Sequence, residues 1–172
     1  MGNGYSLSEL ESIQDKWRLS FPPDLVALMR QRRPLQVKGF DWLTSSDEDI
    51  QRKLDWPLEG FLFDVRHNDL WWPEWGARPM SETAQAEKLT EIFAAAPRLI
   101  PLYGHRYLPE KPFESGNPVF SVYQSDVIYY GENLADWLAR EENGWDSKQP
   151  IDAANPPKEI PFWSQSVRRN ME

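Results

Sequence analysis

A change of pattern at Pro97 constrains the fold of this chain more than any other feature. Before Pro97 the apolar residues recur at helical spacing. After it come four short segments, rich in aromatic and β-branched residues and separated by turn residues, and then a further helical segment. This order predicts an α+β fold in which N-terminal and flanking helices pack on a central antiparallel β-sheet.

Two helices are predicted in the first part of the chain. Residues 6–19 offer a capping box at Ser6–Glu9 or Ser8–Glu11. Residues 21–34 form the second helix, with Pro23 in its first turn and Pro34 as its stop. The apolar face of the first helix consists of Leu7, Leu10, Ile13 and Trp17.

The next stretch is less regular. Residues 45–57 indicate a short third helix with a capping box at Ser45–Glu48. Residues 57–68 are ambiguous, because alternating apolar residues favour a strand while Pro57 suits a helix start, and we favour the helix. The clearest helix follows within residues 77–97, with Ser81 as its cap.

The strands are predicted in residues 98–104, 105–109, 118–124 and 126–131. The last two form a hairpin around residues 124–126, and a helix within 132–144 follows, with Asn133 as a possible cap. We expect one domain over residues 1–172, with a core at about 6–143 and a proline-rich extension at 144–172. Ile160, Phe162 and Trp163 are expected to attach part of that extension to the core.

Composition excludes several classes of protein. The chain has no cysteine, which excludes disulfides and thiolate chemistry and favours a reducing, cytoplasmic location. Its first ten residues contain no signal-peptide pattern, and no apolar run is long enough to span a membrane.

Charge is distributed unevenly. The net charge is −8; residues 1–40 carry six cations against four acids, and residues 41–172 carry thirteen against twenty-three. Because phosphate binding needs clustered positive charge, direct binding of nucleic acid is not expected. An acidic body instead favours a basic protein partner, although solubility alone also explains it.

The segment LWWPEWG provides the first candidate binding residues, Trp71, Trp72 and Trp75. Nine tryptophans in one chain are many, and tryptophan is seldom completely buried. We expect Trp71 and Trp75 to seal the helices onto the sheet and Trp72 to reach the surface. Core packing remains the alternative for every one of these aromatics.

YGHRYLP is the second candidate. If one strand continues through Gly104, then Tyr103, His105 and Tyr107 share a face and Arg106 points the other way. Tyrosine and arginine are frequent binding hot spots. Alternatively, Arg106 pairs with a buried acid such as Asp126 and only stabilises the sheet.

The remaining candidates are two tyrosines and three acids. Alternation along the last strand allows only one of Tyr129 and Tyr130 to share a face with Val127. Asp47, Glu48 and Asp49 could meet a basic partner, or could simply suit the positive end of a helix.

No catalytic, cofactor or metal site is predicted. The nine glycines form no phosphate-binding loop, and no serine lies in a nucleophile elbow. A metal at His67 would need convergent ligands that the sequence does not indicate. The chain is therefore interpreted as a binding protein rather than an enzyme, with a hydrolase using acids beside the tryptophan cluster as an alternative.

From Phe21 to about residue 138 the chain resembles the SUKH superfamily, which includes fungal cell-wall assembly regulators and bacterial immunity proteins. The resemblance rests on FPPDLVALM, FDVRHNDLWWPEWGARP, LIPLYGHRYLP and GNPVFSVYQSDVIYYGENLADWL, in that order. It implies an α+β fold and a non-catalytic immunity protein that neutralises a polymorphic toxin, in many cases a nuclease, by direct binding. A small-molecule or peptide-binding regulatory module, with the tryptophan cluster as its pocket, is the alternative.

Overall fold

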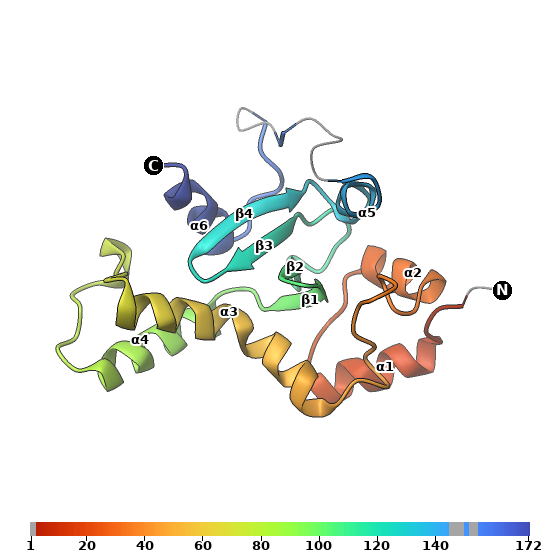
Figure 1. Ribbon diagram of the computed structural model, residues 1–172, viewed down its shortest axis with the longest axis horizontal. Coiled ribbons are helices and arrows are strands. Elements are labelled where there is room, and N and C mark those ends of the chain that lie inside the picture. Colours follow the sequence, from red (N-terminus) through yellow and green to blue (C-terminus); the bar gives the residue numbers. More distant parts are fainter. Residues whose placement is uncertain (1–2, 145–149, 152–154) are drawn as a thin grey trace.

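The computed structural model describes residues 3–144, 150–151 and 155–172, and these residues have the predicted α+β architecture (Figure 1). The predicted extension lies partly outside the described residues, at 145–149 and 152–154. The elements in chain order are α1 (Leu7–Trp17), α2 (Pro23–Gln31), α3 (Asp47–His67), the 3-10 helix η1 (Pro73–Trp75), α4 (Glu82–Ala95), β1 (Leu99–Tyr103), β2 (Arg106–Pro109), β3 (Val119–Tyr123), β4 (Asp126–Gly131), α5 (Leu134–Asn143) and α6 (Trp163–Asn170).

The four strands form an antiparallel meander in the order β1-β2-β3-β4. Gly104 and His105 join β1 to β2, and Tyr103 pairs directly with Arg106 across this tight turn. No single strand therefore continues through Gly104, and the alternation drawn from Tyr103 to Tyr107 does not apply. The reason is local: Gly104 adopts a φ of 55°, a left-handed conformation that glycine tolerates and that reverses the chain.

Helices cover both faces of the sheet, and each face has its own core. On one face Ile100, Leu108 and Val119 pack with residues of α1, α2 and α5. On the other face Tyr107 and Phe120 pack with residues of α3, α4 and α6. In Figure 1, α1, α2 and α5 lie toward one end of the sheet, while α4 and the second half of α3 extend toward the other. Because both faces are covered, successive residues of one strand are buried in different cores.

Helix α3 is one helix of 21 residues and joins the two cores. The prediction of a short helix ending at Pro57 is wrong, because the helix continues through that buried proline. Ile50 packs in the first core, and Phe61 and Val65 pack in the second. Burial of such side chains contributes about 1.5–3 kcal/mol each, which together offsets the roughly 3 kcal/mol that an internal proline costs a helix.

Helix caps follow the local sequence closely. At α1 the Ser6 hydroxyl accepts from the Glu9 amide at 3.1 Å, while the Glu9 carboxylate accepts from the Ser6 amide at 2.8 Å. Ser81 and Asn133 cap α4 and α5 as predicted. The capping box predicted at Ser45–Glu48 is wrong: Ser46 is the cap of α3, and its hydroxyl accepts from the Asp49 amide at 3.1 Å.

Two side-chain expectations need correction or extension. Leu7 is 51% exposed, so the buried face of α1 begins at Leu10. In the C-terminal extension, the burial of Ile160 and Trp163 is confirmed, and Phe162 is half-buried.

The sequence did not predict α6, which packs on β4; its residues are mostly polar, and buried Trp163 and Val167 hold it in the second core.

Candidate binding cleft

The three tryptophans of LWWPEWG do not form a pocket. Trp72 and Trp75 are 7% and 6% exposed, whereas Trp71 is half-buried and donates its indole N–H to the Gly76 carbonyl at 2.8 Å. The prediction that Trp72 reaches the surface is therefore wrong. A 3-10 helix has three residues per turn, so η1 places Trp72 and Trp75 on the same side, with ring centroids 4.8 Å apart.

The second core closes over Trp72 from a distant part of the chain. The Trp72 ring lies 5.7 Å from that of Phe162, at the entrance to α6, and 5.8 Å from that of Phe61. The C-terminal residues therefore cover a ring that local sequence leaves available for the surface. LWWPEWG therefore contributes Trp72 and Trp75 to the second core.

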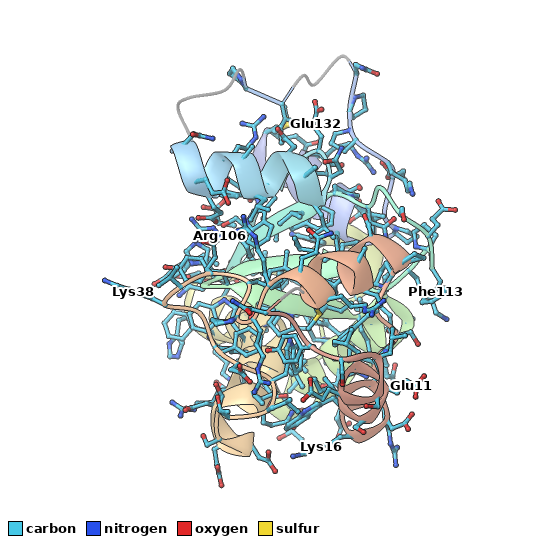
Figure 2. The ribbon with its side chains drawn as sticks, turned by 90° about the vertical axis from the view of Figure 1, so that its right-hand side faces the viewer. Glu11, Lys16, Lys38, Arg106, Phe113 and Glu132 are labelled. Atoms are coloured by element: carbon cyan, nitrogen blue, oxygen red, sulfur yellow. The ribbon has the colours of Figure 1, made fainter. Side chains whose placement is uncertain are left out.

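Arg106 also has a structural role. Its Nε lies 3.0 Å from a carboxylate oxygen of Glu141 in α5, and its guanidinium lies 4.2 Å from the centre of the Tyr130 ring. Figure 2 shows Arg106 between the sheet and that helix. The alternative prediction, that Arg106 pairs with an acid, is confirmed. The acid is Glu141 rather than Asp126.

The two tyrosines of β4 face opposite ways. Tyr129 packs in the second core with Val127, stacks on Phe120 at 5.3 Å and donates to the Ser164 hydroxyl at 2.9 Å. Tyr130 packs against the first core. The alternation predicted for this strand is confirmed, and both rings have packing partners.

The three acids at the start of α3 lie at its positive end, as the structural alternative predicts. Asp47 pairs with Lys16 at 2.7 Å, and Asp49 pairs with Arg52. Glu48 is exposed beside them. All three lie at the surface, and only Asp49 reaches the cleft described next.

An open cleft of about 590 Å³ lies between α3, the segment before it and the turn that joins β1 to β2. It brings Asp49, His105 and Tyr107 together, three of the residues singled out by the sequence. Its lining consists of Lys38, Gly39, Phe40, Ser45, Asp49, Arg52, Lys53, Trp56, Gly104, His105, Tyr107 and Tyr123.

Partly exposed aromatic rings form one wall of the cleft. Trp56 and Tyr123 are 40% and 52% exposed, and their centroids lie 5.7 Å apart in an edge-to-face arrangement. His105 contacts Tyr123 in the same way at 5.8 Å. Trp56 donates its indole N–H to the Val122 carbonyl at 2.7 Å, which orients its ring before any partner arrives.

The turn between β3 and β4 sets the position of this wall. It closes on α3 where Gly60 carries no side chain, and a Cβ there would lie 2.8 Å from the Gln124 Cα. Buried Asp64 accepts from the Ser125 amide at 2.8 Å and from its hydroxyl at 2.6 Å. Together these contacts hold Tyr123 against Trp56.

Burial favours the uncharged forms of two polar side chains that line the cleft, Tyr107 and His105. Tyr107 donates to the Lys53 carbonyl at 2.6 Å, and burial raises the pKa of its hydroxyl. Burial lowers the pKa of His105, and neighbouring Arg106 lowers it further, which favours a neutral imidazole. His105 therefore lines the cleft as an uncharged polar group, whereas the buried Tyr107 hydroxyl is already occupied by its hydrogen bond to Lys53.

The charge of the cleft is opposite in sign to that of the molecule. Lys38, Arg52 and Lys53 line it against the single acid Asp49. Lys53 places its ammonium 5.1 Å from the centre of the Phe40 ring. In the described part of the chain no three His, Asp or Glu side chains converge as metal ligands. The cleft is thus equipped for aromatic and anionic contacts.

Sequence reasoning missed the residues that shape this cleft. The sequence indicates two separate segments at residues 45–57 and 57–68, which hides the face shared by Lys53 and Trp56 with later residues of α3. Tyr123 lies in a predicted strand with no further signal of its own. The available signal is spacing: on one continuous helix Trp56, Gly60 and Phe63 recur at four and then three residues and so share a face. Phe63 is 46% exposed on that face.

Comparisons with family models, with curated proteins and with solved structures found no match to this chain. Within the described residues, no helix combines the length and apolar character needed to cross a bilayer.

Proposed function

We propose that this chain is a non-catalytic binding protein, and specifically an immunity protein that neutralises a basic protein toxin, of nuclease type, by direct binding. One observation carries the binding role: a pre-formed cleft with the exposed, oriented rings of Trp56 and Tyr123 on its wall. Exposed aromatic side chains held rigid by the fold lose little entropy when they are covered, and such side chains dominate protein-binding hot spots.

The charge and the sequence resemblance support the identity of the partner. A net charge of −8 speeds the approach of a basic protein, and nuclease toxins are basic because they bind phosphates. The resemblance to the SUKH superfamily adds the expectation of an immunity protein encoded beside its toxin. A cytoplasmic site of action follows from this role.

A ligand-binding regulatory module is the second candidate, and the same cleft favours it. Its volume of about 590 Å³ falls within the range of roughly 300–1,000 Å³ typical of small-molecule sites. The tryptophan cluster first considered as its pocket is excluded, because Trp72 and Trp75 are buried.

Co-expression with the toxin encoded by the neighbouring gene tests the proposal. The chain should protect cells and co-purify with the toxin as a complex. Tyr123→Ala should weaken the complex about tenfold or more, because that ring is exposed on the wall of the cleft beside Trp56. Phe113→Ala is the matched control, since Phe113 is also exposed, at 60%, and lies across the molecule from Lys38 of the cleft in Figure 2.

Absence of both protection and a complex would refute the toxin partner. Equal weakening by the two substitutions would instead refute the cleft as the docking surface.

A further inference from the structure

The charge reversal at the cleft indicates what its occupant carries. The whole chain has eight more acids than cations, yet the cleft gathers three cations around one acid. Arg52 is engaged by Asp49, which leaves Lys38 and Lys53 as the positive charges available to an occupant. An occupant with a basic surface here would meet like charge, which is unfavourable for directly opposed groups.

We propose that the cleft captures an acidic peptide segment of a protein partner, with one aromatic side chain inserted against Trp56 and Tyr123. Carboxylates on either side of that ring would lie near Lys38 and Lys53. The Trp56 and Tyr123 rings already meet edge to face at 5.7 Å and expose part of their surfaces, so a third ring can extend the same arrangement.

The geometry favours a peptide over a phosphate-bearing ligand. A phosphate needs several donors that converge on one point, and here one of the three cations is already paired with Asp49. The Asp49 carboxylate would also repel a phosphate dianion more strongly than it repels a single carboxylate. Carboxylates spaced along an extended segment need only one cation each, which suits separate lysines at the rim of an open cleft.

This inference rests on the binding role proposed above and adds the chemistry of the bound segment. The partner as a whole is basic and is attracted by the acidic body, whereas the segment that enters the cleft is acidic. Opposite charges at the two surfaces would fix the orientation of the partner, because the reversed arrangement places like charges together.

Binding of synthetic peptides to the full chain tests the inference without any toxin. The probe is the acetylated and amidated peptide Asp-Glu-Phe-Glu-Asp, with Lys-Lys-Phe-Lys-Lys and Asp-Glu-Gly-Glu-Asp as matched peptides. Proton–nitrogen NMR spectra report the site through the Trp56 indole signal, assigned by its loss in Trp56→Phe. Only the first peptide should shift that signal at sub-millimolar concentration. Added salt should weaken the binding of this peptide.

Charge-reversal variants separate a local effect from one of net charge. Lys38→Glu combined with Lys53→Glu should lower the affinity for the acidic peptide about tenfold or more. Lys88→Glu combined with Lys111→Glu changes the net charge equally at residues outside the cleft and should leave affinity within about twofold.

Three results would overturn the inference: no shift with the acidic peptide, equal weakening by both double variants, or tighter binding of adenosine monophosphate at the same signal. Failure of the toxin experiment with success of the peptide experiment would refute the toxin partner alone. The opposite pattern would refute the acidic segment alone.

Discussion

Gly60→Ala tests how the fold builds the cleft. Gly60 lies inside α3, where glycine is about 1 kcal/mol less favourable than alanine. By helix propensity alone, the substitution would stabilise the protein. The structure predicts the opposite, because the β3–β4 turn packs directly on the bare Cα of this residue.

The magnitude follows from the contact distances. A Cβ at residue 60 would lie 2.8 Å from the Gln124 Cα, closer than Cβ atoms approach other atoms in proteins, and 3.0 Å from its nitrogen, which is tighter than most such contacts. Both are backbone atoms of a turn that is also held by Asp64, so the turn cannot yield as a flexible side chain would. Over-packing of this kind costs roughly 1–3 kcal/mol. Because both contacts are with rigid backbone, we take the upper part of that range, roughly 2–3 kcal/mol. Subtraction of the propensity gain of about 1 kcal/mol leaves an expected net loss of about 1–2 kcal/mol.

Urea unfolding followed by circular dichroism measures this loss directly. A midpoint of thermal unfolding lower by roughly 3–6 °C is the corresponding shift for a domain of this size. Glu59→Ala is the matched control, because the neighbouring side chain is exposed and alanine suits the same helix; its effect should stay within about 0.5 kcal/mol. Displacement of the turn should also move Tyr123, so the acidic peptide should bind less tightly.

A Gly60→Ala protein as stable as the wild type, or more stable, would refute the reasoning. It would mean that the turn does not pack against α3 as described, and the wall of the cleft would lose its structural basis.

Three further predictions test other parts of the structure. Trp72→Ala should lower the free energy of unfolding, measured in urea, by about 3–5 kcal/mol, and Trp71→Ala by roughly 1 kcal/mol, because the first ring is buried and the second is half-buried. A larger loss for Trp71→Ala than for Trp72→Ala would contradict the packing of η1. Arg106→Met should cost about 2 kcal/mol by leaving the nearly buried Glu141 carboxylate without its cation, and an unchanged unfolding midpoint would show that the pair is not stabilising. Burial raises the pKa of the Tyr5 hydroxyl from 10.0 to about 12. The unfolded chain therefore releases this proton at lower pH than the folded chain, and the free energy of unfolding should fall between pH 10 and 12. Tyr5→Phe should flatten that fall, and an unchanged pH profile would contradict the raised pKa.

Most helices and strands could be predicted because their signals are local. Capping serines, first-turn prolines and the glycine at the β1–β2 turn act within a few residues, and alternation in β4 correctly separated Tyr129 from Tyr130. The α+β class follows from the order of these segments. Where local signals conflicted, as at Pro57, the burial of distant side chains decided the outcome in favour of one long helix.

The site itself could be predicted only in part. Asp49, His105 and Tyr107 were candidates and do line one cleft, but no local pattern connects them. The pairing of the Trp56 and Tyr123 rings results from contact between α3 and β3. The two residues are 67 positions apart in the sequence. Their pairing depends on Gly60, whose importance is visible only when the turn packed against it is known.

The segment LWWPEWG shows the same division. Its sequence alone determined a tight turn at Pro73 and Gly76, because proline and glycine restrict or extend backbone freedom within the segment itself. Which tryptophan reaches solvent was decided by tertiary structure, since Phe162, 90 positions later, packs over Trp72. Local sequence sets the conformations available to a segment, whereas burial depends on surfaces contributed by distant parts of the chain.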